Sequence, residues 1–273
     1  MCASSRQSRS ITSPCWATQS PRSRRKKAGI IKSGAAVVCA DGQPEDALAV
    51  LRHAADAVGA VWFTGTTDYK LLRCDIGGSA FVYEGQGYTT ALLGRHQLQN
   101  AATALRTVAA LRERGWEIPV EAAVRGLARA RIAGRLERVV DAPLVLLDGA
   151  HNAAGIEALG NAVDELLKMR RLHVVMGMVR DKQYEVCVRE MARRADAFYA
   201  CTPPVADRSL AEETVAAIAA RSCSAVYDCV TVEQAIGMAL DHAEPRDCVL
   251  VCGSLYLIGE AEKILRGRPK ATD

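Results

Sequence analysis

The second half of the chain alternates between short, continuously apolar runs and longer stretches with apolar residues at helical spacing. Four apolar runs have the character of strands buried on both faces of a sheet. These runs are Leu144–Leu147, Leu172–Met176, Ala197–Cys201 and Cys248–Cys252. The stretches predicted to be helices are Ala153–Lys168, Lys182–Arg193, Leu210–Ala220, Val232–Asp241 and Tyr256–Leu265. This alternation predicts a doubly wound α/β domain with parallel strands over residues 131–273.

Residues 26–130 have a more mixed pattern. Short strands are expected at Ala35–Ala40, Val61–Phe63, Tyr69–Cys74, Ala80–Glu84 and Tyr88–Leu93. A helix is expected at Pro44–Val58, a long amphipathic helix starts near Gly94 and ends at Gly115, and another helix covers Glu121–Ala130. Because the rhythm of the pattern changes near Arg131–Arg135, we expect a domain boundary after residue 130.

Charge is distributed unevenly along the chain. The formal net charge is +4, but residues 1–32 carry eight basic groups and no acid, which leaves 27 basic and 31 acidic side chains in the rest. Such a balance provides no broad basic surface for a nucleic acid, so we expect small-molecule partners.

Cysteine usage and hydropathy narrow the class of protein further. The ten cysteines form no Cys-x-x-Cys pair, so we expect buried apolar thiols rather than disulfides or a zinc site. No apolar run reaches the roughly 18 residues of a membrane span. We therefore expect a cytoplasmic protein that contacts no membrane.

Three polar or glycine positions come directly after predicted strands. Asp148, Gly177 and Gly253 each follow one of the apolar runs. Ligands of doubly wound sheets bind at the carboxyl ends of the strands, so these positions predict the functional edge of the domain.

Four short motifs add candidate chemistry. They are Lys27-Ala28-Gly29-Ile30, Gly94-Arg95-His96-Gln97-Leu98-Gln99-Asn100, Gly134-Arg135-Leu136-Glu137 and Asp148-Gly149-Ala150-His151-Asn152. With these motifs the chain resembles the folylpolyglutamate synthase/dihydrofolate synthase family of the Mur ligase superfamily. The resemblance implies a truncated C-terminal part of an ATP-binding central domain over residues 26–130. It further implies a Rossmann-like C-terminal domain over residues 131–273.

The resemblance also implies a reaction. An ATP- and magnesium-dependent, ADP-forming ligase of this family adds glutamate to a folate or to dihydropteroate through an acyl phosphate. Asn100, Arg135 and Asp148 would contact ATP, and a guanidinium suits phosphate oxygens because its donors form a rigid fork. His151 would be catalytic near the phosphates, and Lys27, if carbamylated, would hold magnesium.

Three of these residues, Asp148, Arg135 and Asn100, have a simpler structural explanation. Asp148 fits an Asx turn or a helix cap, since a helix is predicted to start near Asn152. Arg135 fits an interdomain salt bridge, and Asn100 with His96 fits a polar helical turn. The combined order and spacing of the motifs favours the ligase interpretation.

The expected phosphate-binding loop, Gly-x-x-x-x-Gly-Lys-Ser/Thr, does not occur in this sequence. Residues 1–25 are rich in Ser and Arg, lack acids and have no periodicity, so we expect a non-native or disordered segment there. A shifted reading frame over Ser10–Arg24 would restore a family-like sequence, which favours an out-of-frame segment over a transit peptide. We therefore expect a truncated and inactive copy of a ligase that is monomeric at full length.

Three alternatives stay open at this point. The chain could be a non-catalytic nucleotide-binding or regulatory protein, or another Mur-type amide ligase. A dinucleotide oxidoreductase is the third, but no Gly-x-Gly-x-x-Gly follows a predicted strand. The sequence does not distinguish a folate substrate from dihydropteroate.

Overall fold

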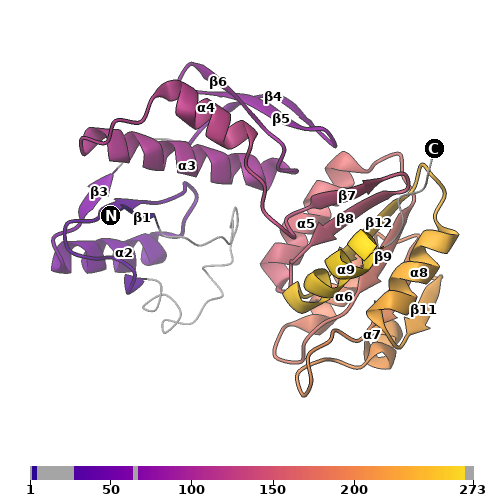
Figure 1. Cartoon of the computed structure of the whole chain (residues 1–273). Coiled ribbons are helices and arrows are strands. Elements are labelled where there is room, and N and C mark those ends of the chain that lie inside the picture. The colour runs from indigo at the N-terminus through magenta and orange to yellow at the C-terminus, as the bar shows by residue number, and fades with distance from the viewer. Residues whose placement is uncertain (1, 5–27, 64–66, 268–273) are drawn as a thin grey trace. The chain divides into compact units, whose positions relative to one another are not determined.

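The computed structural model describes residues 2–4, 28–63 and 67–267, and the chain divides into two compact units, Met1–Ala130 and Arg131–Asp273 (Figure 1). The expected non-native segment over residues 1–25 lies outside the described residues, apart from Cys2–Ser4. Lys27 also lies outside them. The two units are described separately below.

The first unit contains two small sheets. Its strands are β1 (Cys2–Ser4), β2 (Ala36–Val38), β3 (Val61–Phe63), β4 (Lys70–Asp75), β5 (Gly78–Tyr83) and β6 (Gln86–Thr90). Its helices are α2 (Glu45–Ala57), α3 (Arg95–Glu113) and α4 (Val120–Ala128). Strands β1-β2-β3 are parallel, and β4-β5-β6 form an antiparallel meander.

Helix α3 is the common support of both sheets. Its Ala110 packs against Ala36 and Val38 of β2, and its Leu98 packs against Phe81 of β5. Because α3 buries side chains on two sides, its apolar residues are spread over a wide arc of the helix. The long helix predicted from Gly94 to Gly115 is thus confirmed, with Gly94 as its N-cap.

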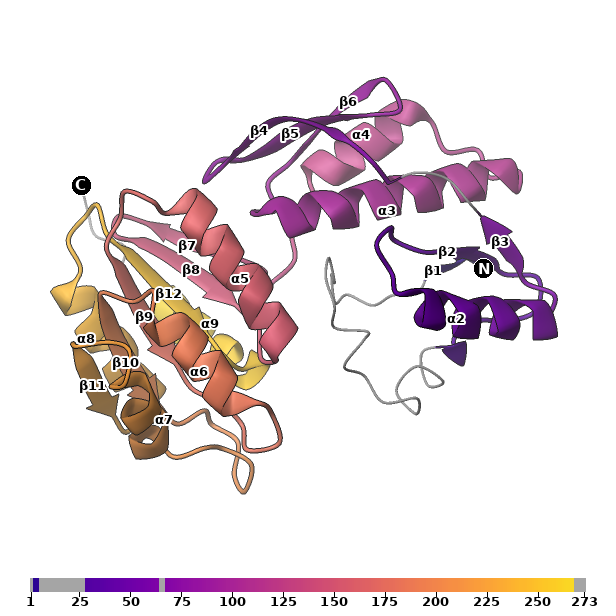
Figure 2. The same cartoon turned by 180° about the vertical axis from the view of Figure 1, so that it is seen from behind.

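The second unit is built on one six-stranded sheet with the order β11-β10-β9-β12-β8-β7. The strands are β7 (Glu137–Asp141), β8 (Leu144–Asp148), β9 (Leu172–Met176), β10 (Ala197–Cys201), β11 (Val226–Cys229) and β12 (Cys248–Cys252). The helices are α5 (Ala153–Leu166), α6 (Tyr184–Ala192), α7 (Glu212–Ala219), α8 (Val232–His242) and α9 (Leu255–Gly267). Helices α8 and α9 cover one face of the sheet (Figure 1), and α5, α6 and α7 cover the other (Figure 2).

The predicted doubly wound α/β architecture is therefore confirmed, and all four predicted central strands are parallel and fully buried. Two edge strands were missed. Strand β7 runs antiparallel to β8, so the sheet is mixed rather than purely parallel. Both β7 and β11 are only partly buried, and half-exposed edge strands lack the continuous apolar run that identified the others.

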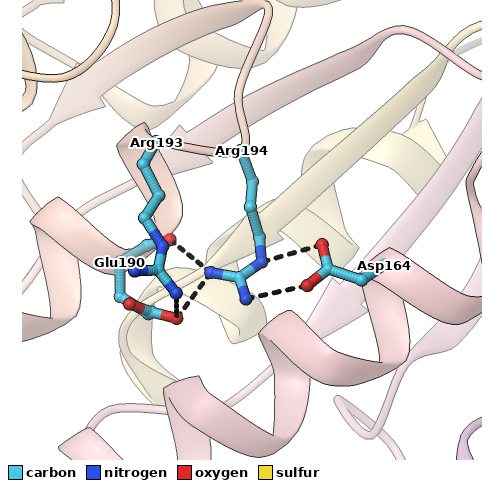
Figure 3. Close-up of polar contacts among 4 residues, drawn as sticks. All are labelled: Asp164, Glu190, Arg193 and Arg194. Atoms are coloured by element: carbon cyan, nitrogen blue, oxygen red, sulfur yellow. Dashed lines mark hydrogen bonds and ion pairs between the residues drawn. The ribbon is translucent and has the colours of Figure 1, made fainter.

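Helices α5 and α6 are joined by an arginine clamp (Figure 3). The Arg194 guanidinium donates from Nε and Nη2 to the two carboxylate oxygens of Asp164, at 2.9 and 2.8 Å, and its Nη1 donates to Glu190. The guanidinium covers Gly160 of α5 so closely that an added Cβ would lie 2.8 Å from Arg194 Cζ. A glycine at residue 160 thus makes room for the clamp.

The eight cysteines within residues 28–63 and 67–267 are all free, and six of these eight are buried, as expected. Burial raises the pKa of the Cys187 and Cys248 thiols to about 12, so both stay protonated and behave as apolar side chains. Among the described helices, none is both long and apolar enough to cross a membrane.

Candidate functional site

The carboxyl ends of β8, β12 and β9 lie side by side in the second unit. Cys252 at the end of β12 is in register with Asp148 on one side and with Met176 on the other. Asp148, Gly177 and Gly253 therefore meet at one edge of the sheet, as the sequence predicted. In doubly wound folds this edge is the usual place for a ligand.

The backbone at this edge is packed too closely for side chains. A Cβ on Gly149 would overlap Leu255 Cδ2, and a Cβ on Gly177 would overlap the carbonyl oxygen of Cys201. At Gly253, which has φ +110°, it would lie 2.6 Å from the carbonyl oxygen of Gly177. At Gly177 and Gly253 glycine is required because neighbouring main chains approach one another directly, whereas the close contact at Gly149 is with the Leu255 side chain.

Asp148 ends β8 and joins two loops. Its Oδ1 accepts a hydrogen bond from the Ala150 N–H and its Oδ2 accepts one from the Leu136 N–H, each at 2.8 Å. The first of these bonds is an Asx turn, the simpler explanation given by sequence. The second is a contact across twelve residues, which ties the loop before β7 to the loop after β8.

Burial has the largest influence on the pKa of the Asp148 carboxyl. The residue is only 4% exposed, and this burial raises the pKa of its carboxyl to about 6. The two backbone N–H donors and, to a smaller extent, the charge of Arg135 lower the pKa and so limit the rise. A buried carboxyl with a raised pKa at the ligand edge of a sheet is typical of a functional site.

Arg135 lies on the loop that Asp148 holds. Glu137 Oε2 accepts a hydrogen bond from the Gly134 N–H at 2.8 Å, and the Gly149 N–H donates to the Gly134 carbonyl at 2.7 Å. Arg135 is partly exposed between the buried residues Gly134 and Leu136. Its guanidinium is therefore carried by a well-anchored main chain at the ligand edge.

The loop after β8 leads directly into helix α5. Asn152 is the N-cap of α5, with its Oδ1 accepting from the Gly155 N–H at 2.9 Å. His151 Nδ1 lies 2.7 Å from the Gly149 carbonyl oxygen, which can only accept, so Nδ1 carries a proton. Nε2 is then the nitrogen of His151 that can exchange a proton during a reaction.

The structure thus brings together Arg135, Asp148 and His151, but not all of the predicted site. Asn100 belongs to the first unit, where its Nδ2 donates to Gln97 Oε1 at 3.0 Å on helix α3. Lys27, the predicted metal ligand, lies outside the described residues. In the described ranges no group of three or more His, Cys, Asp or Glu side chains could hold a metal ion.

Glu137 was not predicted as part of the site. Its role depends on the turn between Gly134 and Glu137, in which Leu136 has φ +46°. In a capping box a Glu accepts from the backbone N–H three residues before it, and the same spacing between Gly134 and Glu137 is the one signal in the sequence. The contact between Asp148 and Leu136 has no local signal at all.

A family model described as "Mur ligase, glutamate ligase domain" matches residues 134–255, which include Arg135, Asp148 and His151. The chain is 33% identical over 256 residues to the dihydrofolate synthase/folylpolyglutamate synthase of Bacillus subtilis. That match covers 88% of this chain and 57% of the relative. The chain therefore spans a little more than half the length of such relatives.

Two solved structures have the same fold over most of this chain. One is Escherichia coli FolC in complex with DHPP and ADP, with a TM-score of 0.72 and 26% identity over 90% of this chain and 56% of that one. The other is the Mycobacterium tuberculosis folylpolyglutamate synthase complexed with ADP and AMPPCP, with a TM-score of 0.76 and 26% identity over 90% of this chain and 59% of that one. Sequence motifs, fold and comparisons agree: residues 134–255 match the Mur ligase glutamate ligase domain, and most of this chain is similar in sequence and fold to members of the folylpolyglutamate synthase/dihydrofolate synthase family.

Proposed function

We propose that this polypeptide is part of an ATP-dependent ligase that joins glutamate to the carboxylate of a folate or of dihydropteroate. The observation that carries the proposal is the junction of Arg135, Asp148 and His151 at the carboxyl edge of the sheet, within the segment that matches the glutamate ligase domain. Relatives with this fold bind ADP, which supports a nucleotide at this edge.

Arg135 would bind the phosphates. A guanidinium offers several N–H donors in one plane, and charge-assisted bonds to phosphate oxygens are about twice as strong as neutral ones. The amino end of α5 also presents backbone N–H groups, which favour an anion. Asn100, on the first unit, would contribute a side-chain amide to the nucleotide.

Asp148 and His151 would serve the same nucleotide. The carboxylate of Asp148 has a second lone pair on each oxygen, which can accept from a ligand hydroxyl while the backbone bonds persist. His151 would hold or transfer a proton through Nε2 close to the phosphates. ATP itself would supply the activation of the carboxylate as an acyl phosphate.

Magnesium belongs to the proposal through the family resemblance and not through side chains of the described ranges. Those ranges contain no cluster of ligands that fits a metal ion, and Lys27 lies outside them. We therefore assign no reaction step to a metal here. The partners in this proposal are small molecules, and the location is the cytoplasm.

An assay of the purified chain tests the proposal. ADP release would be measured with ATP, magnesium and L-glutamate, with either tetrahydrofolate or dihydropteroate as the acceptor, and the glutamylated product would be identified by mass spectrometry. ADP release that depends on both glutamate and the acceptor is expected for a ligase. Binding of ADP without turnover would instead identify a non-catalytic nucleotide-binding protein.

A further inference from the structure

Two carboxylates hold the main chain on either side of Arg135. Glu137 accepts from the N–H of Gly134, and Asp148 accepts from the N–H of Leu136, both at 2.8 Å. The carbonyl of Gly134 accepts a third bond, from the N–H of Gly149. The peptide group before Arg135 is thus held by Gly149, the one after it by Asp148, and the next one upstream, between Ala133 and Gly134, by Glu137.

The conformation of this loop needs such support. Gly134 has φ +62° and Leu136 has φ +46°, and the left-handed region is unfavourable for a residue with a side chain such as Leu136. A Cβ on Gly134 would also lie 3.0 Å from Ile258 Cγ2 of helix α9. A strained loop persists when the surrounding contacts determine it, and strain of this kind is common where a side chain must be aimed.

We propose that Glu137 is a positioning residue for Arg135, acting with Asp148 to set the main chain from which the guanidinium reaches the nucleotide phosphates. The inference rests on the proposed function, in which Arg135 binds those phosphates. A hydrogen bond to a charged acceptor is stronger than one between neutral groups. A loop that is ordered in advance loses less entropy when the ligand binds, so the contribution appears as nucleotide affinity.

A simpler role for Glu137 is to cap the turn without any effect on Arg135. The two roles differ in how substitutions at residues 135 and 137 combine. If Glu137 acts through Arg135, its loss weakens nucleotide binding only while the Arg135 side chain is present. If Glu137 only stabilises the fold, its loss has the same effect in both backgrounds.

A double-mutant cycle on the full chain measures this difference. ADP with magnesium would be titrated calorimetrically into the wild type, Arg135→Ala, Glu137→Ala and the double variant. We expect about tenfold weaker binding for Glu137→Ala, which corresponds to about 1.4 kcal/mol. The double variant should bind within about twofold of Arg135→Ala, as the coupling argument requires.

Two further variants serve as a rescue and a control. Glu137→Gln keeps an oxygen that can accept from Gly134 and should bind within about threefold of the wild type, because a neutral acceptor is weaker than a charged one. Glu233→Ala removes the same charge next to β11, the edge strand at the other end of the sheet, and should not change the affinity. If Glu137→Ala does not fold, Glu137→Asp replaces it, since the shorter side chain withdraws the carboxylate from Gly134.

The outcomes distinguish a failure of the proposed function from a failure of the positioning role of Glu137. If Arg135→Ala binds ADP as tightly as the wild type, or the wild type binds none, the proposed function fails and the inference fails with it. If Arg135→Ala weakens binding but Glu137→Ala does not, the proposed function stands and the positioning role is wrong. Equal effects of Glu137→Ala in both backgrounds also overturn the positioning role.

Discussion

One carboxylate oxygen of Asp148 accepts a hydrogen bond from the backbone N–H of Leu136 at 2.8 Å. Leu136 belongs to the loop before β7, and Asp148 is the last residue of β8. Through this bond a buried acid at the end of a central strand determines the geometry of an edge loop that carries Arg135. A residue expected to bind a nucleotide therefore also organises the protein side of the site.

The stability of the second unit should depend on the protonation of Asp148. The pKa of its carboxyl is raised to about 6 in the folded chain, against about 3.9 for an unperturbed aspartate. A raised pKa means that the folded chain binds more protons than the unfolded chain between these values. The stabilisation is therefore complete below about pH 4 and is lost as pH rises through about 6, with a span of about 3 kcal/mol.

Urea unfolding between pH 4 and pH 7.5 measures this effect. Other titrating groups contribute equally to the wild type and to Asp148→Asn, so the difference between their unfolding free energies isolates Asp148. We expect that difference to shift in favour of the wild type as pH falls. A difference that is independent of pH would contradict the raised pKa.

Substitution by alanine should have opposite effects on stability at two glycines, Gly253 at the closely packed ligand edge and Gly259 in helix α9. Gly253→Ala places a Cβ 2.6 Å from the carbonyl oxygen of Gly177 at φ +110°, so we expect a loss of at least about 2 kcal/mol of unfolding free energy. A Cβ on Gly259, within α9, would meet no atom within 4 Å apart from the helix's own backbone. Gly259→Ala should stabilise the chain by up to about 1 kcal/mol through helix propensity. Thermal unfolding of both variants tests the pair, and a tolerated Gly253→Ala would show that these backbones can separate.

The arginine clamp between α5 and α6 predicts that two neighbouring arginines differ in importance. Arg194 has a side chain that is 11% exposed and contacts Asp164 with two parallel bonds, whereas Arg193 is 57% exposed and contacts Glu190 alone (Figure 3). Arg194→Lys should cost about 1 kcal/mol because an ammonium cannot form the fork. Arg193→Lys should change the unfolding free energy by less than about 0.5 kcal/mol. Equal losses measured by chemical denaturation would argue against the clamp.

A buried chain of hydrogen bonds predicts the tautomer of His173. Its Nε2 lies 3.3 Å from Asp247 Oδ2 and its Nδ1 lies 3.1 Å from the Tyr199 hydroxyl, which in turn lies 3.0 Å from His242 Nδ1. An ionised Asp247 only accepts, so we expect a proton on Nε2 of His173 and a hydroxyl proton donated by Tyr199. Nitrogen chemical shifts of the histidine side chains would report this tautomer, and a proton on Nδ1 alone would contradict it.

Removing the Tyr199 hydroxyl measures how much these hydrogen bonds contribute to the unfolding free energy. Tyr199→Phe leaves Nδ1 of the buried His173 without this partner and should cost roughly 1–3 kcal/mol. Tyr227→Phe is the control. The Tyr227 ring stacks on the Tyr199 ring with 4.9 Å between the ring centroids, and a phenylalanine keeps that stacking. Both values come from denaturant unfolding. A loss as large for Tyr227→Phe would assign the effect to packing and not to the hydroxyl.

Much of the fold could be predicted because central strands of a doubly wound sheet are buried on both faces. Leu144–Leu147 and Cys248–Cys252 had to be continuously apolar, and their pattern identified them without any tertiary information. Strands β7 and β11 could not be found in this way, because each is exposed on part of its surface at an edge of the sheet. Their formation depends on pairing with β8 and β10, which supply the missing hydrogen-bond partners.

The sequence by itself determined the chemical groups of the candidate site and their order along the chain. It placed Asp148, Gly177 and Gly253 after buried strands, and the parallel direction of those strands was enough to bring them to one edge. Only the tertiary structure decided how these groups act on one another. The bond from Leu136 to Asp148 joins residues twelve positions apart, and the raised pKa of Asp148 results from its burial in the folded sheet, so neither is encoded in local spacing.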